Sequence, residues 1–193
     1  SKGYILTGDD SLCSRPMERV ISPLNLMGAN IKSKNGFPPL HFPSNKQIIN
    51  GIQYSMPISS AQVKSAIILS ALNAKNDTTI SQPSLSRDHS ERMLTSMGAK
   101  IKLTKNFINI KPSLLSSIDL EIPGDISSAS YWIIAGLIHR NAELTIKNVG
   151  VNPSRIGILN VLKRMNANFS LTNNKIIGNE PVADINVSSS KLI

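Results

Sequence analysis

Anion binding is the chemistry suggested by three arginines, because each follows a serine at the expected start of a helix: Arg15, Arg87 and Arg155. A helix start carries partial positive charge, so an arginine in the first turn is unfavourable unless a negative group compensates it. Acidic neighbours are one source, Glu18 for Arg15, and Asp88 and Glu91 for Arg87. A phosphate or carboxylate is the other, because guanidinium and free helix amides both bind it. We favour an anion for Arg15 and Arg87, and a structural role for Arg155, which has no acidic residue near it in the sequence.

The segments that position these arginines are copies of one unit, which recurs about every 70 residues. Each arginine opens an expected helix that ends in Met-Gly-Ala or Met-Asn-Ala, and Ser59–Ala61 recurs as Ser127–Ala129. The positions just past the three helices are Gly28, Gly98 and Asn166. Glycine and asparagine best tolerate the left-handed conformation that ends a helix. The landmarks agree with one another, so we treat the repeat as real.

The expected order of elements within a unit is helix, strand, helix, strand, strand, with a further short strand possible at the start. This βαβαββ-like pattern belongs to the α/β (α+β) class. We expect the stretches 99–112 and 167–178 each to contain a hairpin with asparagine at its turn. About two and a half units are present, because the first lacks its opening helix. Pro123-Gly124 indicates a hinge, and we place a domain boundary near Ile122.

The stretch "SSAQVKSA", which begins at Ser59, is expected to start a buried helix. Its two serines should cap that helix, and a serine cap contributes about 1 kcal/mol. The pair recurs in the third copy as Ser127-Ser128, where Ser128 corresponds to Ser60, so we expect capping to be the role common to both copies. Gln62 and Lys64 have no counterpart of their type there, since Lys64 aligns with Trp132. Residues specific to one copy are the better candidates for binding.

Composition and charge exclude several classes of protein. The 193 residues are 40% hydrophobic and only 4% aromatic, which predicts an aliphatic core, and no apolar run approaches the roughly 20 residues that span a bilayer. The net charge of +9 is spread along the chain without a nucleic-acid-binding motif, so we expect no nucleic-acid partner. The histidines and Cys13 lack metal-ligand spacing, which predicts no metal site. A lone cysteine without a signal-peptide pattern indicates the cytoplasm.

Five motifs together resemble one known family in their order and spacing. They are "LTGDDSLCSRPMERVISPLNLMGANI", "SAQVKSAIILSAL", "SRDHSERMLTSMGAKI", "PGDISSASYWIIAGLI" and "NPSRIGILNVLKRMNANF". The resemblance is to the 5-enolpyruvylshikimate-3-phosphate (EPSP) synthases, or 3-phosphoshikimate 1-carboxyvinyltransferases, in the form that carries Ser-Ala-Gln. It covers essentially the whole chain.

The resemblance implies the enolpyruvyl transferase fold, an inverse α/β barrel-like pair of domains with three repeat units each. About two and a half of those six units would be present here. Residues 1–122 would then be part of the N-terminal domain, which binds shikimate 3-phosphate, and residues 123–193 would be the first unit of the C-terminal domain. The full-length family enzyme is expected to be a monomer.

The implied reaction transfers the enolpyruvyl group of phosphoenolpyruvate to the 5-hydroxyl of shikimate 3-phosphate and releases phosphate, in aromatic amino-acid synthesis. It passes through a tetrahedral intermediate and requires no cofactor. Both substrates are anions, which gives the arginines a purpose. By motif, Arg15 would hold the phosphate of phosphoenolpyruvate, and Gln62 would lie between the two substrates. The residues that would contact shikimate 3-phosphate are Ser60, Ala61, Gln62, Ser86 and Arg87.

The family's acid and base groups for proton transfer have no counterpart in residues 1–193, so we expect no catalytic residue in this chain. The chain alone should bind shikimate 3-phosphate weakly and turn nothing over. One alternative is UDP-N-acetylglucosamine enolpyruvyl transferase, whose reactive cysteine lies further upstream of its Arg-Pro than Cys13 lies from Arg15. The other is a non-catalytic repeat module for anionic polymers, whose affinity would collapse with salt.

Overall fold

A computed structural model describes residues 3–44, 47–104 and 106–193, which fall into two compact units. Of the described residues, those up to 86 and those from 97 to 116 form the first unit, and residues 87–96 and 117–193 form the second. No helix in the described ranges combines the length and apolar character needed to cross a membrane.

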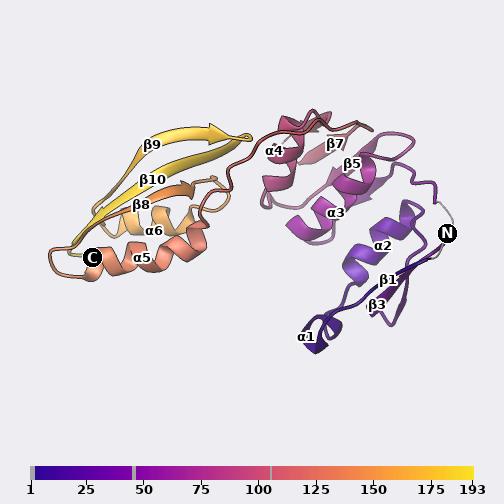
Figure 1. Cartoon of the computed structure of the whole chain (residues 1–193), viewed down its shortest axis with the longest axis horizontal. Helices are drawn as coiled ribbons and strands as arrows, with labels where there is room; N and C mark the ends of the chain where they lie inside the picture. The colour runs from indigo at the N-terminus through magenta and orange to yellow at the C-terminus, as the bar shows by residue number, and fades with distance from the viewer. Residues whose placement is uncertain (1–2, 45–46, 105) are drawn as a thin grey trace. The chain divides into compact units, whose positions relative to one another are not determined.

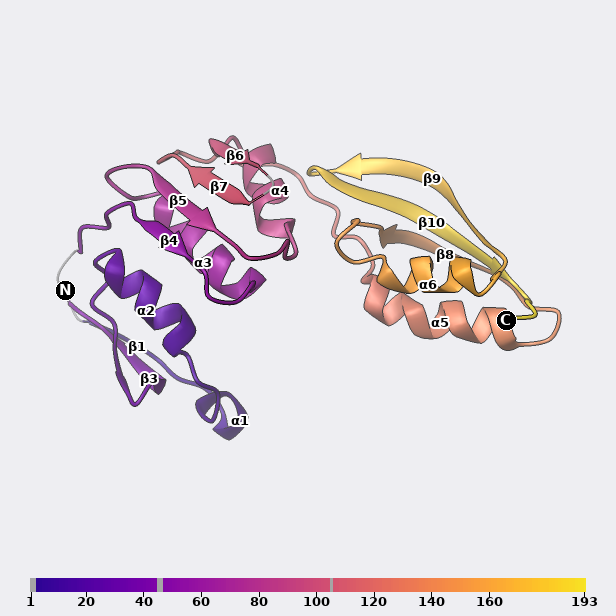
Figure 2. The same cartoon turned by 180° about the vertical axis from the view of Figure 1, so that it is seen from behind.

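The first unit contains two sheets, each accompanied by helices (Figure 2). One is the antiparallel sheet β1-β3-β2, and the other has the order β4-β5-β7-β6, in which only β4 and β5 run parallel. Helix α2 packs against α3, and α3 contacts β5. The elements of this unit are β1 (Tyr4–Leu6), α1 (Asp10–Cys13), α2 (Glu18–Leu26), β2 (Lys32–Lys34), β3 (Phe37–Phe42), β4 (Gln53–Ser55), α3 (Ala61–Ala71), β5 (Thr78–Ser81), β6 (Ile101–Leu103) and β7 (Phe107–Ile110).

The second unit is a three-stranded antiparallel sheet of order β8-β10-β9, with α5 and α6 on one face (Figure 1). Its core lies between that face and the two helices, and includes Ile133 and Leu137 from α5, Leu159 and Leu162 from α6, and Ile185 from β10. The aliphatic core predicted from composition is therefore present. The elements of this unit are α4 (His89–Ser96), α5 (Ile126–Ile138), β8 (Glu143–Gly150), α6 (Gly157–Arg164), β9 (Phe169–Ile177) and β10 (Glu180–Ser188).

The repeat predicted from sequence is confirmed by strand order. In the second copy the sheet order is β4-β5-β7-β6, and β4 is the short opening strand. In the third copy a parallel bridge from Gly124 to Val149 takes the place of β4, and β8-β10-β9 follows in the same relative order. The first copy supplies the matching trio β1-β3-β2. The same connectivity thus recurs three times.

The three predicted helix stops are also confirmed. Gly28 and Gly98 have φ of 100° and 95°, and Asn166 has φ of 54°. Each of these residues lies just past the end of the helix that follows Arg15, Arg87 or Arg155, namely α2, α4 or α6. The substitution of asparagine for glycine in the third copy preserves the backbone conformation.

One of the two predicted hairpin turns is wrong. In the second copy β6 and β7 form a hairpin through Asn106, next to Lys105, which lies outside the described residues. In the third copy β9 continues through Asn173, and the chain turns instead at Gly178-Asn179. Asn173, with φ of 50°, forms a bulge where the β9–β10 register shifts. Its Nδ2 donates to Asp184 Oδ2 at 2.8 Å, and this bond helps to hold the pKa of Asp184 below its ordinary value.

The predicted cap of the third copy's opening helix is wrong as well. Asp125 is the N-cap of α5, and its Oδ1 accepts from Ser127 N at 3.1 Å. Ser128 therefore lies inside the first turn of α5 and does not cap it. A carboxylate at the cap satisfies the free amides and opposes the positive end of the helix dipole.

Candidate anion-binding site

The start of α3 has the features of an anion site. Ser60 is the N-cap, with extended φ of −141° and ψ of 115°, and its Oγ accepts from Val63 N at 3.4 Å. The first intrahelical backbone bond runs from Lys64 N to Ser60 O at 3.0 Å, which leaves the Ala61 and Gln62 amides without intrahelical acceptors. No acidic residue stands in the first turn, and Gln62 is exposed. The positive end of the helix is therefore open to an anion.

Ser86 is tied to this helix start through Lys64. The Lys64 side chain is buried, and its Nζ donates to Ser86 O at 3.4 Å. The Ser86 hydroxyl donates to Gln82 Oε1 at 3.1 Å. The structure thus links Ser86 to α3, the helix that begins with Ser60, Ala61 and Gln62, through the Lys64 side chain.

Arg15 and Arg87 lie outside helices, so their predicted place in a first turn is wrong. Arg15 is in the loop between α1 and α2, three residues before α2 begins, and Arg87 is two residues before α4. Both are exposed, and within the described residues neither side chain has a hydrogen bond or ion pair. Arg15 is not joined by such a bond to the α3 start, and Arg87 belongs to the second unit. Their guanidinium groups are available to an anion.

Arg155 has the structural role expected of it, although for a different reason. It precedes α6, and its Nη2 donates to Ser127 Oγ at 2.6 Å and to Asp125 Oδ1 at 3.2 Å. The acidic partner comes from the cap of α5, distant in the sequence, so it could not be found among near neighbours. Ser127 N–H, with Arg155 in support, holds the pKa of Asp125 below its ordinary value.

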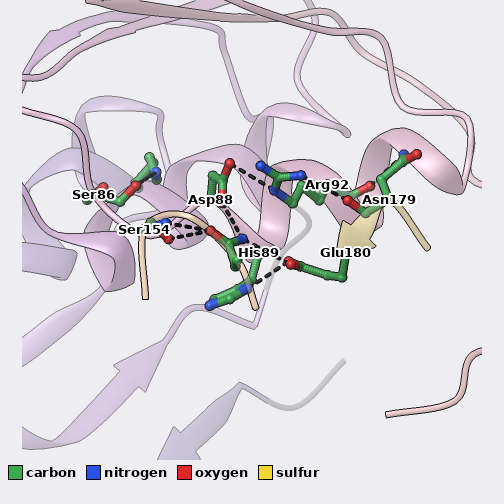
Figure 3. Close-up of polar contacts among 9 residues, drawn as sticks. Ser86, Asp88, His89, Arg92, Ser154, Asn179 and Glu180 are labelled. Atoms are coloured by element: carbon green, nitrogen blue, oxygen red, sulfur yellow. Dashed lines mark hydrogen bonds and ion pairs between the residues drawn. The ribbon is translucent and has the colours of Figure 1, made fainter. Parts of the chain in front are cut away.

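A polar cluster in the second unit joins α4 to the start of β10 (Figure 3). Its centre is Asn152, which is only 2% exposed and whose Nδ2 donates to Asp88 Oδ1 at 2.8 Å and Glu180 Oε2 at 2.9 Å. Arg92 Nε donates to Asp88 Oδ2 at 2.9 Å, and His89 Nδ1 lies 2.7 Å from Glu180 Oε1. Sequence reasoning missed this cluster, because its members are far apart in the chain and are common surface residue types.

The charge of Asp88 is stabilised by this cluster. Burial by itself raises the pKa of the carboxyl, but hydrogen bonds from Arg92 and Asn152 outweigh it and leave the pKa below its ordinary value. The hydrogen bond to Asp88 in turn raises the pKa of Arg92. Asp88 therefore neutralises Arg92, whereas the sequence suggested it as a neutraliser of Arg87.

A cavity of about 570 Å³ in the second unit is lined by Arg87 together with His89, Asn152, Arg155 and Glu180. This volume lies within the range of sites for small molecules. Within the described ranges, no group of three histidine, cysteine or acidic side chains could hold a metal ion. Two guanidinium groups, those of Arg87 and Arg155, are among the cavity-lining groups, and guanidinium binds phosphates and carboxylates.

The architecture defines the class of protein. The enolpyruvyl transferase NikO from Streptomyces tendae superposes with a TM-score of 0.69 over 92% of this chain, at 16% sequence identity. At that identity the likeness concerns the fold alone, and it confirms the enolpyruvyl transferase fold.

Closer relatives define the family. The EPSP synthase (3-phosphoshikimate 1-carboxyvinyltransferase) family model matches residues 1–192. The EPSP synthase of Acinetobacter baumannii superposes with a TM-score of 0.90 and 40% identity over 97% of the chain. The 3-phosphoshikimate 1-carboxyvinyltransferase of Syntrophomonas wolfei is 50% identical over 191 residues, and that of Synechococcus elongatus is 45% identical over 192 residues. This chain belongs to the EPSP synthase family, and it spans 44% of the length of the Syntrophomonas relative.

Proposed function

We propose that this chain takes part in the transfer of the enolpyruvyl group from phosphoenolpyruvate to the 5-hydroxyl of shikimate 3-phosphate, which yields EPSP and phosphate. The observation that carries the proposal is the α3 start, where free amides, the Ser60 cap and Ser86 are held together in a family member. A phosphate dianion at this point accepts from several donors at once and lies at the positive end of a helix.

The individual roles follow the family's motifs. Ser60, Ala61, Gln62 and Ser86 contact shikimate 3-phosphate, and Gln62 also faces the second substrate. The guanidinium of Arg87 adds charge-assisted hydrogen bonds to shikimate 3-phosphate, and that of Arg15 binds the phosphate of phosphoenolpyruvate. Both arginines are exposed and lack ion-pair partners within the described ranges, which supports these roles.

The proposed domain assignment places residues 1–122 in the domain that binds shikimate 3-phosphate and residues 123–193 in the first unit of the second domain. The chain spans less than half of its relatives' length, and we assign the proton-transfer groups to the remainder. The chain alone then binds shikimate 3-phosphate weakly and does not turn over. The reaction uses no cofactor, the proposed compartment is the cytoplasm, and the complete protein is a monomer.

The test is a chimera in which residues 1–193 replace the matching segment of the Syntrophomonas wolfei relative. Phosphate release from phosphoenolpyruvate is measured with shikimate 3-phosphate, and then with UDP-N-acetylglucosamine in its place. We expect turnover with shikimate 3-phosphate only, and none from residues 1–193 alone. A folded chimera that is inactive with shikimate 3-phosphate, or that prefers the nucleotide sugar, would refute the proposal.

A further inference from the structure

Lys64 is a buried cation in an apolar helix. Its exposed fraction is 1%, and the neighbouring α3 residues Val63, Ile67 and Ile68 are buried as well. Transfer of an ammonium group out of water is unfavourable unless polar acceptors replace the lost hydration. One such acceptor is Ser86 O, 3.4 Å from Nζ. Packing alone does not require a lysine at a buried helical position. The contact between Lys64 and Ser86 O therefore needs another explanation.

The segment 82–86, which leads from β5 towards α4, is fastened to the α3 start at two points. At one point the Ser59 hydroxyl lies 2.6 Å from Ser84 O and accepts from Ser84 N at 2.9 Å. At the other, Lys64 holds Ser86 O. The two contacts fix the backbone of the segment, while the hydroxyl of Ser86 stays free to turn from Gln82 to another acceptor.

In the third copy, the equivalent segment before α6 is attached to the start of α5 by a different contact. There Arg155, the counterpart of Arg87, donates to Ser127, the counterpart of Ser59, at 2.6 Å. The position of Lys64 is taken by Trp132, which is 65% exposed. In that copy the arginine is used to hold the fold together. In the second copy the lysine and the serine do this, and Arg87 has no hydrogen bond or ion pair within the described residues.

We propose that Lys64 is a positioning residue for the shikimate 3-phosphate site, an inference that rests on the proposed function. Lys64 holds Ser86 against the start of α3. This contact does in the second copy what the bond from Arg155 to Ser127 does in the third. Arg87 is thereby left for the ligand. The buried charge also adds positive potential beneath the helix start, where a phosphate dianion would lie. Lys64 itself does not contact the ligand.

The experiment measures the affinity of the 193-residue chain for shikimate 3-phosphate by calorimetry, alongside its melting temperature. Lys64→Met removes the donor and the charge but keeps the stem, and Lys64→Arg keeps both donor and charge. Lys75→Met removes an exposed positive charge from the same unit. Ile67→Val takes one methylene from the core of the same helix, as a control for lost stability.

We expect Lys64→Met to weaken shikimate 3-phosphate binding at least tenfold and Lys64→Arg to restore it to within threefold of wild type. Lys75→Met and Ile67→Val should stay within twofold, even where Ile67→Val lowers the melting temperature. Unchanged affinity in Lys64→Met, or equal weakening in Ile67→Val, overturns the positioning role. A wild-type chain that binds no shikimate 3-phosphate contradicts the proposed function instead.

If Lys64→Met does not fold, Lys64→Gln takes its place, because it keeps a neutral donor on a shorter stem. An affinity at least threefold below that of Lys64→Arg supports the inference. Equal affinities of Lys64→Gln, Lys64→Arg and wild type overturn it.

Discussion

Arg155 Nη2 lies 2.6 Å from the hydroxyl of Ser127, in the first turn of α5. The bond joins the segment before α6 to the start of the helix that opens the same repeat unit. Arg87 occupies the equivalent place in the second copy and makes no such bond within the described residues. The repeat thus provides its own comparison, in which one arginine serves the fold and its counterpart stays available to a ligand.

The cap of α5 can be tested with a pair of substitutions. Asp125→Ala removes the acceptor for Ser127 N and a partner of Arg155, so we expect it to lower the stability of the second unit by about 1 kcal/mol. Ser128→Ala should change stability by less than about 0.5 kcal/mol, because Ser128 is exposed inside the helix. Urea unfolding followed by the fluorescence of Trp132, the only tryptophan, measures both. A larger effect from Ser128→Ala would contradict the assignment.

The ends of helices were predictable from the sequence where residue type alone determines the backbone conformation. Gly28, Gly98 and Asn166 marked the helix stops because few other residues adopt positive φ without strain. The repeat then supplied the order of elements, since each landmark recurred at one spacing. Asn173 shows the limit of this reasoning: positive φ suits a hairpin turn and a bulge equally, and the bond to Asp184 decides between them.

The sequence names candidate site residues but not the contacts around them. Ser60, Gln62 and Ser86 stand in recognisable motifs and remain candidates, whereas the contact of Lys64 with Ser86 was not predicted, because no local pattern indicated that Lys64 is buried. The partner of Arg155 was missed because Asp125 is supplied by another helix. Local propensity describes neighbours in sequence, and these contacts join residues brought close only by tertiary packing.

Alanine substitutions at Gly28 and Gly98, which follow α2 and α4, should distinguish the cost of backbone strain from that of steric overlap. A Cβ on Gly98 would meet nothing within 4 Å, so Gly98→Ala should cost only the left-handed conformation, about 1 kcal/mol. A Cβ on Gly28 would lie 2.7 Å from Ile48 O, so Gly28→Ala should cost about 2–3 kcal/mol. Gly98→Asn, which copies the third unit, should stay within about 0.5 kcal/mol of wild type. Urea unfolding followed by circular dichroism checks the order; equal losses in the two alanine variants would contradict it.

The charge of Asp88 should make the second unit sensitive to acid. Its pKa is lower in the folded protein than in the unfolded chain, so the unfolded state binds more protons as the pH falls. The stabilisation is fully present above the ordinary pKa of about 3.8 and is lost as the pH drops through the folded-state value. We expect Asp88→Asn to be less stable than wild type at pH 7 and to lose less stability between pH 5 and 3. Urea midpoints across that range provide the measurement, and parallel pH profiles would disprove the role of Asp88.

The strongest test of ligand binding compares the two equivalent arginines. Both line the same cavity, but Arg155 is engaged by Asp125 and Ser127, whereas Arg87 has no such bonds within the described ranges. We expect Arg87→Ala to weaken shikimate 3-phosphate binding at least tenfold with little change in melting temperature, because it removes charge-assisted hydrogen bonds to the ligand.

Arg155→Ala should do the reverse, with affinity within twofold and a loss of about 0.5–1 kcal/mol in stability, since its pair is partly exposed. Calorimetry at low and at physiological salt measures the affinities. A module for anionic polymers would instead lose affinity steeply with salt and show no preference for shikimate 3-phosphate over inorganic phosphate. Equal losses of affinity in the two variants would mean that the arginine of the second copy has no special role in binding.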